Sequence, residues 1–253
     1  MLKKIKIFFL ALIAGLICVG IAKDKIFDTP VNAFKKISHM NGRDDVNVFG
    51  TSKVLTYKMF YWSIIPMGEL KFVTNASDQK VVFSAEARSQ GSFIGNFISA
   101  SARVESHFSK QDLLPFKYAE ITDVNGKVKS REVFYDRTES LAVQGNKKIR
   151  IPKETYDPLG AFIRALSYAL EVEQNVSTLF ISSGDLYNLR ARLLEQKGNI
   201  NEVAIDIKRQ NLSSSHGGSL HLWMASDTRI PLVFKSWTPV GYASVVLDKL
   251  EVQ

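Results

Sequence analysis

The chain has 253 residues, of which 45% are hydrophobic and 23% charged, and it carries a formal net charge of +8. This is the composition of a globular protein, and it excludes a disordered or low-complexity chain. The single cysteine excludes a disulfide framework and a cysteine-ligated zinc site. Four histidines leave little for an all-histidine metal site, so we expect no metal and no cofactor.

Residues 1–22 have the pattern of an export signal. Three lysines within residues 3–6 precede an apolar run over residues 7–22, and the run ends in the small-x-small sequence Gly-Ile-Ala that a signal peptidase cleaves. The run is shorter than the ~20 residues that a membrane-spanning helix requires. The sequence therefore predicts a cleaved signal peptide and a periplasmic mature protein. An uncleaved inner-membrane anchor is the alternative.

The rest of the chain predicts a short tether followed by a β domain. Residues 23–50 contain several turn-forming side chains and predict a polar N-terminal tether. From residue 51 apolar and polar side chains alternate with period two, which is typical of antiparallel strands with one wet face. Turn signals such as Asn125-Gly126 separate these runs. We expect residues 51–253 to form one mainly β domain, an antiparallel barrel or strongly curved half-barrel of roughly a dozen strands.

One segment has helical periodicity instead. Asp157 and Pro158 are suited to the N-cap and the first position of a helix. The apolar residues that follow recur at spacings of three and four, and they are Leu159, Phe162, Ile163, Leu166 and Leu170. This predicts a single amphipathic helix over about residues 158–172. Its apolar face must be buried, and the open side or mouth of a curved sheet is the expected place.

Four groups of residues, taken in order, resemble a family of exported bacterial proteins, domain of unknown function 3108. The groups are Leu55-x-Tyr57 with Trp62 and Gly68-Glu69; Val104-Glu105-Ser106 with Leu114-Pro115; Asp157-Pro158-Leu159 with Ala161-Phe162 and Arg164; and Leu222-Trp223 with Asp227, Arg229-Ile230-Pro231 and Gly241. The resemblance spans about residues 53–251. It implies an exported, curved β-sheet or barrel-like fold with one helix, and it implies no established reaction. The architecture is also similar to that of half-barrels that carry lipids or lipoproteins in the periplasm.

The polar residues give no catalytic constellation. Ser106 and His107 are neighbours on a predicted strand, so their side chains point to opposite faces and cannot pair. His216 and His221 lack a third metal ligand in the sequence around them. The chain also lacks the Gly-x-Ser-x-Gly elbow of a serine hydrolase. We therefore expect that the protein is not an enzyme.

Two charged pairs are candidates for structural contacts. Asp227 and Arg229 are two residues apart, so they share a face if they lie on a strand, and we favour a structural ion pair over a ligand contact. Because Pro231 follows, a turn with a local ion pair is the alternative. A contact between Glu105 and Arg164 would lock the helix to the sheet, whereas solvated positions at a rim are the simpler interpretation.

Two predicted loops carry large apolar side chains. Residues 63–68 contain Ile64 and Ile65, and residues 91–98 contain Phe93, Ile94 and Phe97. Exposed apolar clusters in loops often mark a contact site. Alternatively, both loops fold back and plug the end of the barrel.

Together these features predict a non-enzymatic protein that binds an apolar ligand, namely a lipid, an acyl chain or a lipidated protein. The predicted contact residues are those of the two loops together with Phe162, Ile163 and Leu166 of the helix. The alternative is a structural or assembly protein of the cell envelope, with a packed barrel and an apolar surface for a protein partner. The basic balance favours an anionic membrane surface as a further partner, and nucleic acid is not expected because a recognition motif is lacking.

Overall fold

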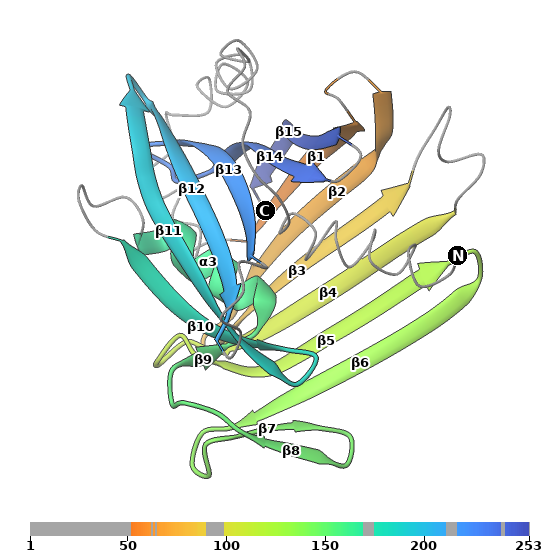
Figure 1. The fold of residues 1–253 in the computed structure, drawn as a ribbon, viewed down its shortest axis with the longest axis vertical. Helices are drawn as coiled ribbons and strands as arrows, with labels where there is room; N and C mark the ends of the chain where they lie inside the picture. The colour runs from red at the N-terminus through yellow and green to blue at the C-terminus, as the bar shows by residue number, and fades with distance from the viewer. Residues whose placement is uncertain are drawn as a thin grey trace.

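The computed structural model describes residues 52–61, 63, 65–89, 99–168, 175–210, 217–238 and 241–252. The predicted signal peptide and tether lie outside these residues. The described elements are fifteen strands and one helix (Figure 1). They are β1 (Lys53–Tyr61), β2 (Ile65–Ala76), β3 (Lys80–Ser89), β4 (Ala100–Ser109), β5 (Pro115–Val124), β6 (Lys127–Asp136), β7 (Leu141–Gln144), β8 (Lys147–Arg150), β9 (Thr155–Tyr156), α3 (Pro158–Tyr168), β10 (Val176–Ser182), β11 (Asp185–Lys197), β12 (Ile200–Arg209), β13 (Gly217–Ala225), β14 (Pro231–Thr238) and β15 (Gly241–Val252).

All fifteen strands belong to one sheet, in the order β8-β7-β6-β5-β4-β3-β2-β1-β15-β14-β13-β12-β11-β10-β9. The first and last strands, β1 and β15, therefore pair near the middle of the sheet, and the chain runs outward from them to both edges. Neighbours are antiparallel except β9 and β10, which are parallel. Among the described strands the edges β8 and β9 do not pair, so the sheet is open. The predicted half-barrel is confirmed, and a closed barrel is not formed.

The sheet has more strands than the dozen that the sequence predicts. The additional ones are short: β7 and β8 have four residues each and β9 has two. Alternation is recognised over roughly four to eight residues, so β9 is too short to show it and β7 and β8 only reach the minimum length. The hairpin of β7 and β8 therefore looks like a loop in the sequence.

The sheet is strongly curved, and its two halves face each other. Shifts of register interrupt several ladders, for example between Thr56 and Tyr57 and between His107 and Phe108. Bulges of this kind bend a strand and increase its twist. In Figure 1 the long strands β2–β6 form one arm and β10–β13 the other, with α3 between them. At one end the arms touch, because Arg131 Nη1 of β6 donates to Ser183 Oγ in the turn after β10 at 3.1 Å.

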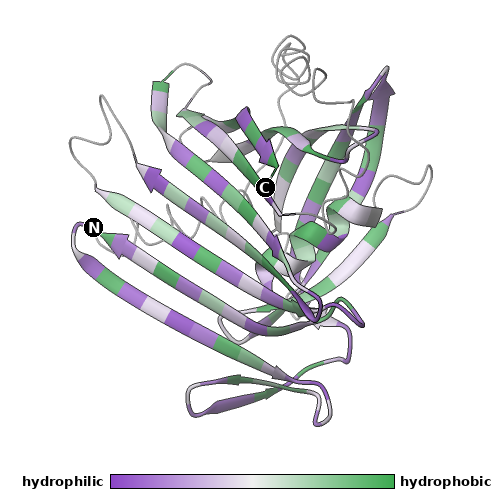
Figure 2. Cartoon of the chain, turned by 180° about the vertical axis from the view of Figure 1, so that it is seen from behind, coloured by the Kyte–Doolittle hydropathy of each residue, from purple (hydrophilic) through white to green (hydrophobic). Residues whose placement is uncertain are grey.

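Side chains alternate between the two faces of the sheet, as Figure 2 shows by the alternating hydropathy along the strands. In β4 the buried residues are Ala100, Ala102, Val104, Ser106 and Phe108, and the residues between them are more exposed. The buried face of both arms is the concave one, where it packs around α3 and forms a continuous apolar core. This confirms the period-two prediction.

The helix α3 begins where the sequence predicts. Asp157 is its N-cap, and its Oδ1 accepts a hydrogen bond from the backbone N–H of Gly160 at 2.8 Å. The predicted apolar face is buried: Leu159, Ile163 and Leu166 are each 6–7% exposed. The helix packs on β9, β10 and β11 and on β4 of the opposite arm. Leu170, the last predicted member of the face, lies outside the described residues.

A close approach between α3 and β4 explains the glycine in the first turn of the helix. A Cβ atom on Gly160 would lie 2.6 Å from the ring atom Cζ of Phe108, which is closer than side chains tolerate. Glycine therefore lets the helix approach the sheet at this point, although it is a poor helix former. In the described part of the chain, α3 is too short to cross a membrane.

Candidate functional site

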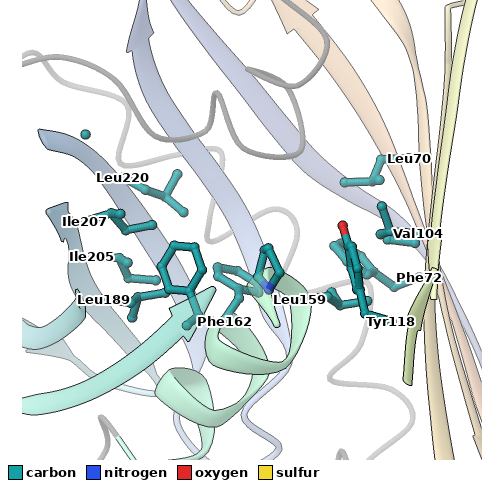
Figure 3. A pocket seen from close by; sticks show the side chains of 14 residues that line it. Leu70, Phe72, Val104, Tyr118, Leu159, Phe162, Leu189, Ile205, Ile207 and Leu220 are labelled. Atoms are coloured by element: carbon teal, nitrogen blue, oxygen red, sulfur yellow. The ribbon is translucent and has the colours of Figure 1, made fainter. Parts of the chain in front are cut away.

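An apolar hollow lies on the concave face, between the two arms and above α3. It contains about 740 Å³ of space that no atom fills, part of it open to solvent. Figure 3 shows side chains of β11–β13 on one side, side chains of β2, β4 and β5 on the other, and Leu159 and Phe162 of α3 between them. Its lining consists of Leu70, Phe72, Ala85, Val104, Tyr118, Pro158, Leu159, Phe162, Phe180, Leu189, Ile205, Ile207, Gly218 and Leu220.

A second hollow of about 630 Å³, also open to solvent, adjoins the first. Phe72 of β2 and Phe162 of α3 line both, so these two rings stand at the boundary. The second hollow is lined by Leu55, Tyr57, Phe72, Val73, Thr74, Phe83, Ser84, Phe162, Ile163, Leu166, Ser167, Arg229, Pro231 and Phe234. Both hollows are open to solvent, so each volume includes space outside the protein surface.

Aromatic rings organise the boundary between the hollows. The ring of Phe234 on β14 lies 5.7 Å from that of Phe162 and 5.5 Å from that of Tyr57, measured between centroids. The Tyr57 hydroxyl donates to the backbone oxygen of Pro231 at 3.0 Å, which fixes this tyrosine. Phe72 and Phe162 are only partly buried, whereas Phe234 and Tyr57 are buried. The boundary therefore consists of two partly exposed rings on a rigid aromatic base.

The polar atoms around the first hollow are already paired. Tyr118 donates its hydroxyl hydrogen to Glu120 Oε2 at 3.3 Å, and the Arg131 guanidinium lies 5.6 Å from the Tyr118 ring centroid. Arg131 also forms an ion pair with Glu120, and both side chains are largely buried. The ring of Tyr118 thus presents carbon to the hollow while its hydroxyl belongs to a neighbouring charge network.

A buried carboxyl group lies beneath the first hollow, at the start of α3. The Ser106 hydroxyl donates to Asp157 Oδ2, and the same carboxyl caps the helix. Because Asp157 is removed from water, its pKa rises from 3.8 to about 6. His107, the next residue along β4, lies on the outer face within 3.5 Å of Glu105. Ser106 and His107 therefore point to opposite faces, as predicted.

The structure brings three predicted contact residues to the hollows. Phe162 lines both, and Ile163 and Leu166 line the second one. Ile64, Phe93, Ile94 and Phe97 lie outside the described residues. Phe72 on β2 and the residues from β11–β13 were not predicted as contacts. Their alternation marks them as inward-facing, but it does not show which strands face one another across the interior.

The prediction that Ile65 lies in an apolar hairpin loop is wrong. After a register shift between Met59 and Phe60, β1 and β2 pair as far as Tyr61 and Ile65, so Ile65 is the first residue of β2. Ile65 is half-buried and Met67 is buried. These apolar residues therefore belong to the sheet, and Ile65 lines neither of the two hollows.

Of the two interpretations of Glu105 and Arg164, the contact between them is wrong. Glu105 lies on the outer face of β4, where its carboxylate pairs with Arg103 at 2.5 Å. Arg164 lies on the helix inside the curved sheet, with its guanidinium 5.1 Å from the ring centroid of Tyr156. The sheet separates the two side chains. The sequence alone does not show which face of β4 meets the helix. It therefore could not predict that the side chains of Glu105 and Arg164 lie on opposite sides of the sheet.

Asp227 and Arg229 lie in the connection between β13 and β14, which confirms the turn, while the ion pair between them stays a prediction. Arg229 has a left-handed backbone with φ of 57°. Its Nη1 atom donates to the backbone oxygen of Ser167 at the C-terminal end of α3, at 3.0 Å. Arg229 also lines the second hollow. Among the described residues, no group of three histidine, cysteine or acidic side chains is placed to hold a metal ion.

Fold and hollows together define a β-barrel-like protein with an open sheet and an apolar interior. A solved structure with this architecture is the beta-barrel-like protein of domain of unknown function DUF1849 from Brucella abortus. It is 10% identical, with a TM-score of 0.56 over 80% of this chain and 98% of that one, which shows likeness of fold alone. The family model "Protein of unknown function (DUF3108)" matches residues 56–248, and the chain belongs to this family. The predicted resemblance is confirmed. No curated protein matches the sequence.

Proposed function

We propose that this protein binds an apolar ligand, a lipid, an acyl chain or the acyl group of a lipidated protein, and that it catalyses no reaction. The observation that carries the proposal is the pair of adjoining apolar hollows on the concave face. Burial of a ten-carbon chain contributes about 8 kcal/mol at ~0.8 kcal/mol per methylene, before the cost of association. That is ample for a carrier.

An assembly protein of the cell envelope is the rival function. A barrel with that role needs a packed interior and an apolar outer surface. Here the concave side is only partly filled, and the partly buried Phe72 and Phe162 border open space. The interior thus favours ligand binding over a purely structural role.

Filling the first hollow tests the proposal. Ala85 lines this hollow between Phe72 and Val104 of the neighbouring strands, so Ala85→Leu occupies part of it. We expect the affinity for a fluorescent fatty acid to fall roughly tenfold, which is about 1.4 kcal/mol. Ala119→Leu is the matched control. Ala119 pairs with Glu105 across the ladder of β4 and β5, so its side chain lies on the outer face of the sheet.

The control should bind as the wild type does. Overpacking a core costs about 1–3 kcal/mol. Circular dichroism and thermal melting therefore test whether both variants are folded. A folded Ala85→Leu protein with unchanged affinity contradicts binding in this hollow. If the wild type binds no apolar probe, the proposed function is wrong.

The proposed compartment is the periplasm, and it rests on the export signal in residues 1–22. N-terminal sequencing of the protein made in bacteria tests it. A mature chain that begins near Lys23, in the periplasmic fraction, is the expected result. An intact Met1 in the membrane fraction would show that residues 7–22 anchor the protein instead.

A further inference from the structure

We propose that the ligand is a single-chain amphiphile with an anionic end group, a carboxylate or a phosphate, and that Arg229 is the site of that group. This inference rests on the proposed function and specifies its ligand class. Of the described residues that line the two hollows, Arg229 is the only charged one. A positive charge at the rim of an otherwise apolar site is complementary to an acyl chain that ends in a negative charge.

The backbone around Arg229 holds the guanidinium at that rim. The Arg229 N–H donates to the backbone oxygen of Ala225, and the Ala225 N–H donates to that of Ile230, each at 3.0 Å. The left-handed backbone of Arg229, unfavourable for a side chain with a Cβ, is kept by these bonds. Pro231, two residues further along the chain, accepts a hydrogen bond from the Tyr57 hydroxyl through its backbone oxygen. These bonds hold the backbone that carries the charge, and the bond from Nη1 to the Ser167 oxygen orients the guanidinium.

Arg229 retains hydrogen-bonding capacity for a ligand. The Ser167 oxygen takes one of the five N–H donors that a guanidinium carries. A carboxylate or phosphate needs two parallel donors for a bidentate pair. The hydroxyl-bearing residues Thr74 and Ser167 line the same hollow. The second hollow is thus the polar end of the site.

Among the described residues that line the first hollow none is charged, and the Tyr118 hydroxyl is already hydrogen-bonded to Glu120. Leu220, Ile207 and Leu189 of the β11–β13 arm border the first hollow, on the far side of Phe162 (Figure 3). An amphiphile that matches this arrangement places its end group at Arg229 in the second hollow. Its chain then passes Phe72 and Phe162 into the apolar first hollow between the arms. A neutral chain of the same length would lose the contact with Arg229 but keep the apolar contacts.

Three ligands with the same chain separate the end group from the chain. Dodecanoate, dodecyl phosphate and dodecan-1-ol each displace a fluorescent apolar probe, at pH 8, where a fatty acid in water is ionised. We expect the mature wild-type protein to bind the acid, the phosphate or both roughly tenfold more tightly than the alcohol, as a charge-assisted pair allows. Arg229→Gln should bind all three with the affinity of the alcohol.

The control is Arg190→Gln, the same change at an exposed position of β11 whose neighbour Leu189 points inward. It should discriminate as the wild type does. Arg229→Lys keeps both the charge and a donor for Ser167, so it should keep the preference and the melting temperature. Equal binding of the three ligands by the wild type, or undiminished discrimination by Arg229→Gln, overturns the role of Arg229. The proposed function survives that result. Failure of the wild type to bind any of the three overturns both.

A crosslinking experiment on the wild type does not depend on whether Arg229→Gln folds. A fatty acid with a diazirine beside its carboxylate should label the peptide that contains Ser167 or the one that contains Pro231. Labelling of the Gly218–Leu220 segment instead would reverse the orientation and overturn the assignment. If the protein binds dodecanoate more tightly than dodecyl phosphate, or the reverse, the tighter ligand identifies the end group. Either order is compatible with the same site.

Discussion

Asp157 combines three tasks in one buried carboxyl group. It caps α3, accepts the Ser106 hydroxyl and joins the helix to β4 of the opposite arm. Removal from water raises its pKa to about 6, in spite of hydrogen bonds that favour the ionised form. The folded protein therefore prefers the protonated acid over a pH range in which the unfolded chain has already lost that proton.

The sign of the resulting pH dependence follows from linkage. Between about pH 4 and pH 6 the folded state binds more protons at Asp157 than the unfolded state, so the free energy of unfolding falls as pH rises. The loss is on the order of 2–3 kcal/mol at 1.36 kcal/mol per pKa unit. Asp157→Asn keeps an acceptor for Gly160 but cannot titrate, and it should lack this contribution.

Denaturant unfolding of both proteins at pH 4 and pH 7 measures the effect. The difference between the two proteins isolates Asp157 from the other carboxyl groups, whose pH dependence they share. Identical pH dependence in the two proteins would show that Asp157 is ionised in the fold throughout this range.

At Gly160 two effects oppose each other. In an open helix, Gly→Ala stabilises by about 1 kcal/mol. Here the added Cβ meets the Phe108 ring at 2.6 Å, and overpacking costs about 1–3 kcal/mol. We expect the clash to prevail, so that Gly160→Ala lowers the melting temperature. The double variant with Phe108→Leu should be less destabilised than the sum of the single changes, whereas strict additivity would contradict the clash.

At the scale of the helix, the apolar face of α3 has two separable roles. Ile163 is 7% exposed and packs in the core, where it borders only the second hollow, whereas Phe162 is partly buried and borders both hollows. We expect Ile163→Ala to cost about 2–4 kcal/mol of stability, as truncation of buried aliphatic residues does. Phe162→Ala should cost less stability and weaken fatty-acid binding more.

Thermal melting and probe binding on the same two variants test this division. If Phe162→Ala destabilises as strongly as Ile163→Ala and leaves binding unchanged, Phe162 is a core residue without a role at the site.

The helix and the long strands were predictable from the sequence because each carries its own periodic pattern. Asp157-Pro158 marks the start of the helix, and alternation in segments such as Val203–Ile207 marks the inward face. The hollows were only partly predictable. Phe162 could be predicted because it belongs to the single segment with helical periodicity. Leu70 on β2 and Leu220 on β13 line the same hollow only because the whole sheet curves, and no local pattern shows that curvature. Arg229 was singled out as one of a structural pair, since the sequence does not show that its turn reaches α3.

At the scale of the molecule, the two arms meet where β6 contacts the turn after β10. Arg131 joins them, because it pairs with Glu120 on β5 and donates to Ser183 across the gap. Arg131→Met leaves Glu120 as a largely buried carboxylate with the Tyr118 hydroxyl but no cation beside it, and we expect a loss on the order of 3 kcal/mol. The double variant Glu120→Gln/Arg131→Met should recover much of that stability.

Urea unfolding of the two single variants and the double variant gives the coupling free energy. Ser183→Ala serves as a control that removes only the contact across the gap, with an expected loss of about 1 kcal/mol. A coupling near zero would show that Arg131 and Glu120 behave as a solvated surface pair.

The central claim is that the open, curved sheet of this DUF3108 protein holds an apolar ligand between its arms. Native mass spectrometry of the mature protein, released from the bacteria that produce it and then mixed with dodecanoate, tests the claim most directly. We expect a population heavier than the chain by one bound amphiphile, and a smaller such population for Ala85→Leu under the same conditions. Detection of the bare chain alone, before and after addition of dodecanoate, would contradict the claim.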